Sequence, residues 1–198
     1  MGDFDNTEKD EELVIHYLRG EHDALELLLR RYLGSIYAYA FRLVQDTTHA
    51  EDIAQDTFVK VWQKMHTFRP DASFKTWIFT IAHHTALDFF RKKKHIPLSY
   101  FENNEGQNVL LETVPDDELL PDALFGKGED DAMLESLLST LEPGARAVLT
   151  LHYVEGLTFD EIGKVLHKPL NTVKSQHRRA LLKLRDLLGR TKPNKGLI

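Results

Sequence analysis

The chain has 198 residues and a formal net charge of −6, and this length allows one domain or two small ones. It contains no cysteine, which excludes a disulfide framework, a thiolate metal site and a cysteine nucleophile, and suits a reducing cytosol. Residues 1–12 are polar and acidic, unlike a signal peptide, and no apolar stretch is long enough to span a membrane. We therefore expect a cytoplasmic protein without membrane insertion.

Helical periodicity extends from Glu11 to about Lys94 with few breaks. Apolar residues recur every three or four positions, as on the buried face of a helix. One such stripe consists of Leu25, Leu28, Leu29, Leu33, Ile36, Tyr37, Ala40 and Phe41, and a second of Ile53, Phe58, Val61 and Trp62. Breaks fall at Gly20, 47–48 and 68–71. The pattern predicts a bundle of about four helices, with Phe58, Val61 and Trp62 in its core.

The middle of the chain differs from both flanks. Residues 96–131 have no sustained periodicity, contain three prolines and are rich in acidic side chains. Helical spacing returns at about Met133, and the last helix is expected from about Asn171 to Leu188. We therefore predict an all-α protein with a helical domain over residues 1–95, a flexible acidic linker over 96–131 and a second small helical domain over 132–198.

Basic residues are concentrated in two segments. Residues 1–60 carry 6 basic and 13 acidic side chains, and residues 61–95 carry 7 and 2. Residues 96–165 carry 3 and 15, whereas residues 166–198 carry 9 and 1. Two basic segments in an acidic chain indicate two contacts with DNA. Solvated helix faces give the same pattern, so charge by itself leaves both interpretations open.

The segment GLTFDEIGKVLHKPLNTVKSQHRRALLKL has the layout of a helix-turn-helix. A short helix is followed by a turn at 167–170 and by a second helix, for which Asn171 or Thr172 is the expected N-cap. The apolar face of that helix consists of Val173, Ala180, Leu181, Leu184 and Leu188. Its other face carries hydrogen-bond donors, as a helix in the major groove requires. An ordinary surface helix with a basic face is the alternative.

Three segments together resemble a known family. LTFDEIGKVL followed by NTVKSQHRRALLKL resembles the fourth conserved region of extracytoplasmic-function (ECF) sigma factors. AEDIAQDTFVKVWQKM and FKTWIFTIAHHTALDFFRKKK resemble their second region, in the same order along the chain. The resemblance implies a protein that binds core RNA polymerase and directs promoter-specific initiation. Such a protein recognises the minus-thirty-five and minus-ten elements and promotes DNA melting.

The resemblance also implies a surface for polymerase. Glu51, Asp52, Gln55 and Asp56 share one helical face, and in the family the corresponding face binds the clamp helices of the largest subunit. The flap region of the polymerase is a second expected contact, and the resemblance leaves open whether an anti-sigma protein binds the chain. A solvated acidic helix face is the alternative for the four residues.

Promoter contacts are implied in both domains. For the minus-ten element, the resemblance points to Phe68, Arg69, Phe74, Lys75, Thr76, His83, His84, Arg91, Lys92, Lys93 and Lys94. For the minus-thirty-five element it points to His152, Thr172, Lys174, Ser175, Gln176, Arg178, Arg179 and Lys183. Aromatic and basic groups together suit single-stranded DNA. Trp77 lies on the apolar stripe of its segment and is expected in the core.

Within the recognition helix, Lys174 and Arg178 are expected on the outward face, with Arg179 and Lys183 on a flank. The chain also departs from the family pattern. It has His84 where relatives usually have asparagine, and Gln176 and His152 where arginine is common. Glutamine reaches adenine but lacks the charge of arginine, so promoter sequence and affinity are expected to differ.

Other classes of protein have less support. A helix-turn-helix regulator that acts without joining polymerase is the first alternative, and only the region-two motifs argue against it. An enzyme is not indicated, because the chain has no Walker-type glycine loop and no nucleophile constellation. Ten histidines invite a metal site, but they lack ligand spacing, and the adjacent His83 and His84 diverge on a helix. We therefore expect no catalytic residue, no metal and no cofactor.

Overall fold

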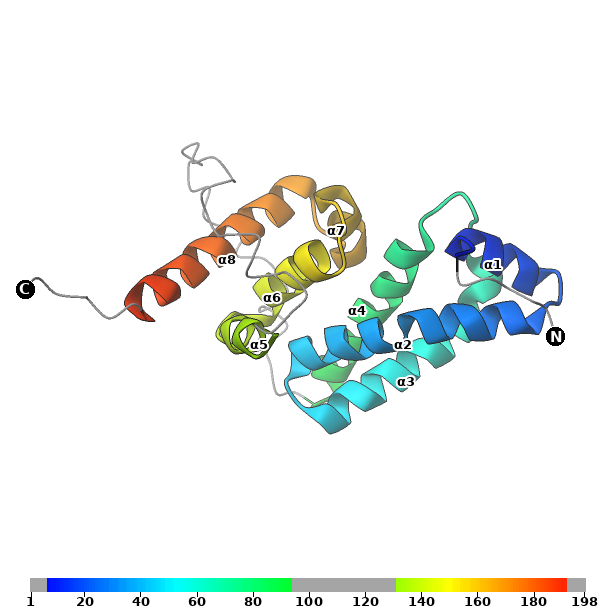
Figure 1. Ribbon diagram of the computed structural model, residues 1–198, viewed down its shortest axis with the longest axis horizontal. Coiled ribbons are helices and arrows are strands. Elements are labelled where there is room, and N and C mark those ends of the chain that lie inside the picture. The colour runs from blue at the N-terminus through cyan, green and yellow to red at the C-terminus, as the bar shows by residue number, and fades with distance from the viewer. Residues whose placement is uncertain (1–6, 94–130, 192–198) are drawn as a thin grey trace, which may run out of the picture.

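The structure is a computed structural model that describes residues 7–93 and 131–191. The first range forms an N-terminal bundle of α1 (Asp10–Leu18), α2 (His22–Val44), α3 (Thr47–Lys64) and α4 (Phe74–Lys93), with a short 3-10 turn, η1 (Met65–Thr67), after α3 (Figure 1). The second range forms a C-terminal bundle of α5 (Asp131–Ser139), α6 (Pro143–Leu149), a π-helical turn η5 (Thr150–Val154), α7 (Phe159–Leu166) and α8 (Leu170–Thr191). The predicted all-α fold is confirmed, since these ranges contain helices and turns but no strand. The predicted linker lies outside the described residues, apart from Asp131 at the start of α5.

The junction between α2 and α3 shows how local sequence ends one helix and starts the next. Gln45 adopts a left-handed conformation with φ of 54°, and its N–H donates to the carbonyl of Phe41 at 2.7 Å. Asp46 then caps α3, because its carboxylate accepts a hydrogen bond from the backbone N–H of His49 at 2.8 Å. The chain thereby reverses within two residues and lays α3 along α2.

The core of the N-terminal bundle consists of aromatic and aliphatic side chains. Tyr39 and Phe79 are fully buried and meet edge to face, with ring centroids 5.4 Å apart. Trp77 is partly buried against this core, 5.3 Å from the ring of Phe68. The expectation for Trp62 is wrong: its side chain is 59% exposed, because it follows the buried Val61 by one helical position and so points about 100° away.

One hydrophobic core extends through both bundles. Residues of α6, η5, α7 and the start of α8 belong to the same buried cluster as the cores of α2 and α4. The shared members from the C-terminal side are Ala147, Val148, Leu151, Leu157, Ile162, Val165, Leu166 and Val173. A second, smaller cluster holds α5, α6 and α8 together through Leu138, Leu141, Leu149, Ala180, Leu181 and Leu184. The two bundles therefore pack directly against each other.

A buried arginine joins the bundles at the carboxyl end of α2. The guanidinium of Arg146 donates to the carbonyls of Leu138, Ser139 and Leu141 within the C-terminal bundle. It also donates to the carbonyls of Arg42 and Leu43, which α2 leaves without helical partners. Nearby, Arg42 forms an ion pair with Glu135 of α5 at 2.6 Å. Arg146 thus caps helix ends in both halves of the molecule.

Candidate nucleic-acid and protein interfaces

The acidic face of α3 is open to solvent. Glu51, Asp52, Gln55 and Asp56 are all exposed, as a protein-binding face requires. Asp52 and Asp56 border a small hollow of about 50 Å³ that they share with Lys60, Asp88 and Lys92 of α3 and α4. Lys60 pairs with Asp88 at 3.4 Å. Among the residues that the structure describes, neither aspartate forms an ion pair, so their carboxylates can bind a cationic partner.

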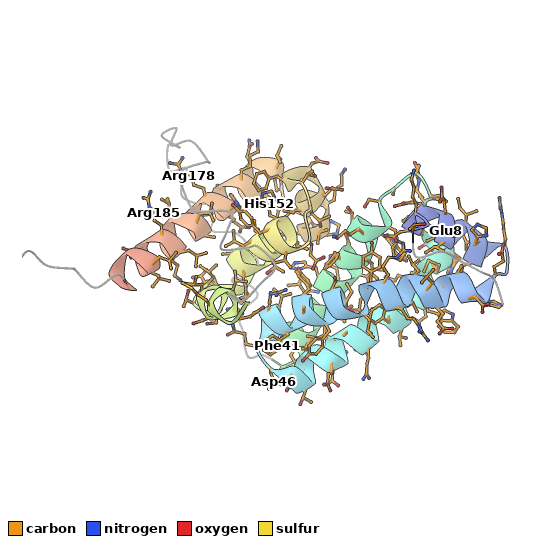
Figure 2. The ribbon with its side chains drawn as sticks, viewed as in Figure 1. Glu8, Phe41, Asp46, His152, Arg178 and Arg185 are labelled. Atoms are coloured by element: carbon orange, nitrogen blue, oxygen red, sulfur yellow. The ribbon has the colours of Figure 1, made fainter. Side chains whose placement is uncertain are left out.

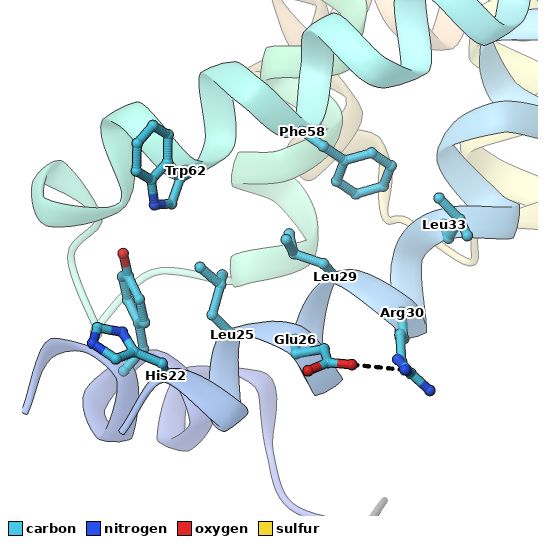
Figure 3. Close-up of a pocket in the computed structure, with 9 residues that line it drawn as sticks. His22, Leu25, Glu26, Leu29, Arg30, Leu33, Phe58 and Trp62 are labelled. Carbon is cyan, nitrogen blue, oxygen red and sulfur yellow. Dashed lines mark hydrogen bonds and ion pairs between the residues drawn. The ribbon is translucent and has the colours of Figure 1, made fainter. Parts of the chain in front are cut away.

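An apolar groove that sequence reasoning missed borders the same helix. It has a volume of about 720 Å³ and lies between α2 and α3, and Tyr17 of α1 also lines it. Leu25, Leu29, Leu33, Phe58 and Trp62 form its apolar wall, and Figure 3 shows His22, Glu26 and Arg30 along its rim. Leu33 and Trp62 are 58% and 59% exposed. Apolar spacing places both residues on the stripes expected to be buried. Which side of each helix faces the core decides that they are exposed, and spacing alone does not give that direction.

The predicted minus-ten residues fall into three groups. Arg69, Arg91 and Lys92 are exposed, and Arg69 is paired with Asp71 at 3.1 Å. These three side chains can meet a phosphate backbone as they stand. The side chain of Lys93 and all of Lys94 lie outside the described residues.

The second group is buried, which corrects the expectation of direct DNA contact. Phe68 and Phe74 are 4% and 0% exposed, and their rings meet edge to face in the core. His83 is 3% exposed and its Nδ1 lies 2.9 Å from the hydroxyl of Tyr39. Burial, together with nearby His84, Lys168 and His167, lowers the pKa of His83 to about 3. These three residues support the helix that carries the other contacts.

The third group faces the C-terminal bundle. Lys75 lies 3.4 Å from the buried carboxylate of Glu155 and donates to the Glu155 carbonyl. The hydroxyl of Thr76 donates to Glu161 of α7 at 3.5 Å. His84 stacks on His167, the residue that ends α7. The surface of α4 expected to meet the minus-ten strand is thus partly covered by α7 and η5.

The helix-turn-helix is formed by α7, a tight turn and α8. Thr158 and Glu161 make a reciprocal capping box at the start of α7. His167 takes a left-handed φ of 51°, and the chain then passes so close to α7 that a Cβ on Gly163 would lie 2.9 Å from the carbonyl oxygen of Lys168. The expected cap at Asn171 or Thr172 is wrong, because α8 begins at Leu170 and the carbonyl of Pro169 accepts from Thr172 and Val173.

The helix α8 carries all of the predicted minus-thirty-five residues except His152. Lys174, Arg179 and Lys183 are exposed, whereas Thr172, Ser175, Gln176 and Arg178 are partly buried. Figure 2 shows Arg178 and Arg185 on the edge of α8 that is turned away from α6. Arg179 is the more exposed of the two arginines, although the expectation placed Arg178 outward and Arg179 on a flank. These seven residues belong to one helix, whereas His152 lies in η5.

His152 has a different setting from the residues of α8. It is partly buried, and its Nδ1 donates to the carbonyl of Leu157 at 2.9 Å. Its ring stacks on Phe159 with centroids 4.5 Å apart and meets His177 edge to face. His152 therefore belongs to an aromatic cluster beneath α8, and it contributes to the packing that supports this helix.

Over residues 7–93 and 131–191, no group of three or more His, Asp or Glu side chains is arranged to hold a metal ion. In these same segments, no helix is long and apolar enough to cross a membrane.

Comparisons with known proteins agree on one family. The Sigma-70 region 2 model matches residues 28–96, and the Sigma-70, region 4 model matches residues 131–184. RNA polymerase sigma factor YlaC of Bacillus subtilis (strain 168) is 32% identical over 163 residues, which cover 82% of this chain and 91% of YlaC. ECF RNA polymerase sigma factor SigW of the same organism is 32% identical over 177 residues, covering 85% of this chain and 93% of SigW.

A solved structure shares the fold. The sigma factor RpoE, in complex with the anti-sigma factor NepR from Bartonella quintana, matches with a TM-score of 0.62 and 24% identity, over 85% of this chain and 98% of RpoE. The matches to YlaC and SigW span more than 80% of this chain and more than 90% of each relative, at more than 30% identity. The chain belongs to the family of ECF RNA polymerase sigma factors, which direct promoter-specific initiation of transcription.

Proposed function

We propose that this sigma factor divides its work between two surfaces, one in each bundle. Residues 1–95 bind core polymerase and the minus-ten element, residues 132–198 bind the minus-thirty-five element, and residues 96–131 connect them. The observation that carries this proposal is the separation of charge: an exposed acidic face on α3 and an exposed basic face on α8 lie on different bundles.

Polymerase is bound by the face of α3 that contains Glu51, Asp52, Gln55 and Asp56. Its clamp helices are the expected partner, and the flap region is the expected partner of the C-terminal bundle. Exposed carboxylates steer a basic partner and fix its orientation. The neighbouring apolar groove, with the exposed Trp62 and Leu33, supplies surface whose burial would stabilise a complex.

Promoter DNA is bound by both basic segments. On α4, Lys75, Arg91 and Lys92 follow the phosphates of the separated strand, with Thr76 and His84 beside the bases. Arg69 contacts DNA from the loop before α4. On α8, Lys174, Arg179 and Lys183 are exposed donors for the duplex, together with the partly buried Thr172, Ser175, Gln176 and Arg178.

These roles are binding roles. Sigma factors are not a class of enzyme, and we propose that the chain has no catalytic activity of its own and acts in the bacterial cytoplasm. RpoE was solved with an anti-sigma factor, and by likeness we propose an anti-sigma protein as a further partner of this chain.

Transcription in vitro tests the proposed function. The purified chain is added to core polymerase on a library of genomic fragments, and the 5′ ends of the transcripts are mapped. We expect start sites that share an upstream and a minus-ten element and that need the chain. Co-purification with core enzyme is measured in parallel. Promoter DNA binding without any association with polymerase would instead identify a regulator that acts on its own.

Open-complex formation tests the assignment of α4. We expect Arg91→Ala to lower the permanganate reactivity of promoter thymines while core binding is retained, because this side chain is exposed and does not border the α3 face. Lys64→Ala, also exposed and basic but at the end of α3, is the matched control. Equal thymine reactivity in all three proteins would show that the end of α4 is only a solvated helix face.

A further inference from the structure

Lys168 occupies an unusual place for a lysine. It lies in the turn of the helix-turn-helix, where its N–H donates to the carbonyl of Gly163 at 2.9 Å and its own carbonyl packs closely over the same glycine. Its backbone is therefore fixed against α7. Its side chain is partly buried and runs towards α8. A lysine held in this way has far fewer positions open to it than one on an exposed helix face.

The ammonium group of Lys168 meets the side-chain amide of Gln176. Lys168 Nζ lies 3.2 Å from Gln176 Oε1. An ammonium has three donors and no acceptor, so it can only meet the oxygen end of an amide. The contact therefore selects one of the two amide orientations. Burial, with a further contribution from Arg179, lowers the pKa of Lys168 to about 8, and the group is still largely protonated at neutral pH.

A fixed amide has a consequence for base recognition. A glutamine that reads adenine uses both ends of its amide, because it accepts from N6 and donates to N7. In Gln176 one of the two lone pairs of the oxygen is taken by Lys168, whereas both N–H donors of the NH₂ group are left for a ligand. Guanine offers acceptors at N7 and O6, and thymine offers one at O4. The orientation of the amide thus favours guanine or thymine over adenine.

We propose that Lys168 is a positioning residue for promoter recognition: it holds the amide of Gln176 so that its NH₂ group reads an acceptor, on guanine or thymine, in the minus-thirty-five element. This inference rests on the proposed function of α8. Lys168 itself does not touch DNA in this scheme. It determines which base Gln176 prefers, and so adds a specificity-determining residue that lies outside the recognition helix.

The test is a transcription profile on promoters whose minus-thirty-five element is randomised. Gln176→Ala identifies the base position that depends on Gln176, because the preference there is lost. We expect the wild type to prefer guanine or thymine at that position. In Lys168→Met the amide is released. Transcription from promoters with adenine at that position should then rise about tenfold relative to the wild type, with no change at other positions, because a factor of this size corresponds to a good bidentate contact.

Two further variants separate positioning from general effects. Lys168→Arg keeps a donor and should keep the wild-type preference. Lys164→Met removes an exposed lysine of α7 that pairs with Asp160, and is the matched control for loss of a positive charge. It should weaken all promoter sequences together, without changing the preference at any position.

A fifth variant protects the test against misfolding. Gln176→Glu still accepts from Lys168 but has no NH₂ group, so its preference should move to the amino groups of cytosine or adenine. If Lys168→Met proves unstable by thermal melting, this variant decides the matter. A wild-type profile in Gln176→Glu, or in a folded Lys168→Met, would overturn the positioning role. A wild type with no preference anywhere in the upstream element would instead overturn the proposed function of α8.

Discussion

The imidazole rings of His84 and His167 stack across the boundary between the two bundles, with centroids 4.7 Å apart and planes inclined by 24°. His84 belongs to α4, and His167 ends α7. Burial lowers the pKa of His84 from its ordinary value of 6.5, and His167 lowers it further. Lys64 and Arg91 act in the same direction, while Asp88 opposes them. The closed arrangement of the bundles thus favours the neutral form of His84.

Acidification should therefore separate the bundles. The contribution of His167 to the lowered pKa of His84 exists only when the bundles are packed, so the packed form binds fewer protons than the separated form and loses stability as the pH falls below about 6.5. We expect the radius of gyration from small-angle X-ray scattering to rise between pH 7.5 and 5.5. His167→Asn tolerates the left-handed backbone and removes one ring of the stack, so its radius should change less. An equal change in both proteins would exclude the histidine pair as the cause.

Polymerase binding should depend on the charge of α3. Asp52→Lys combined with Asp56→Lys should abolish co-purification with core enzyme, since both side chains are exposed and the change reverses the sign of the face. Helicity and melting temperature should stay nearly unchanged. Asp52→Asn with Asp56→Asn keeps the shape and should show a smaller loss. Unfolding of the lysine variant would instead assign the two residues a structural role.

Two adjacent arginines of α8 should respond differently to removal. Arg178 is partly buried and Arg179 is exposed, and a restricted side chain suits a directional base contact, whereas an exposed one suits a phosphate. Arg178→Ala should change which minus-thirty-five variants are transcribed. Arg179→Ala should weaken transcription from all of them. It should also reduce by about 0.9 the slope with which the logarithm of the binding constant falls against the logarithm of salt concentration. Profiles on the randomised element at several salt concentrations measure both effects, and the opposite result would exchange the two roles.

The buried His83 should make stability depend on pH. Its pKa is about 3 in the folded protein, whereas in the unfolded chain it is about 6.5. Below pH 6.5 the unfolded chain gains a proton that the folded protein does not, which lowers the free energy of unfolding by ~2 kcal/mol at pH 5. In urea denaturation at pH 7.5 and 5, His83→Gln should lose this part of the dependence. The same pH dependence in both proteins would contradict the neutral, buried assignment.

Sequence reasoning located the helices because their apolar spacing is a local property. It placed Glu51, Asp52, Gln55 and Asp56 on an exposed face, since i, i+3 and i+4 spacing fixes that relation within one helix. It failed for Trp62, where a shift of one helical position separates core from surface. It also failed for Phe68 and Phe74, because aromatic side chains suit both a base-stacking loop and a core.

Relations between distant segments could not be predicted. The contact of Lys75 with Glu155 and that of Arg146 with the carbonyls of α2 join residues 80 and more than 100 positions apart. Neither pair has a signal in local spacing, and the predicted linker between them places no constraint on how the bundles meet. The need for glycine at position 163 likewise has no local signal, because it arises from the close passage of the turn after α7.

Fixing the two bundles together should block promoter opening. Arg42 and Glu135 face each other across the boundary, and neither is among the proposed contacts. The chain has no cysteine, so Arg42→Cys with Glu135→Cys places one thiol on each side for a short bismaleimide. We expect the cross-linked protein to lose permanganate-detected melting, while the same variant without cross-linker keeps it. Equal melting by the two forms would show that α4 reaches DNA without separation of the bundles.

The shared hydrophobic core makes that separation an equilibrium with a measurable cost. Opening exposes apolar groups of α6, η5 and α7 together with those of α2 and α4, so the open form is a minor population unless a partner covers them. An apparent dissociation constant rises by the inverse of the competent fraction, and a protein open about 1% of the time binds about 100-fold more weakly than its open form. Substitutions at the boundary, far from any promoter contact, would then set the threshold concentration at which the factor competes for polymerase.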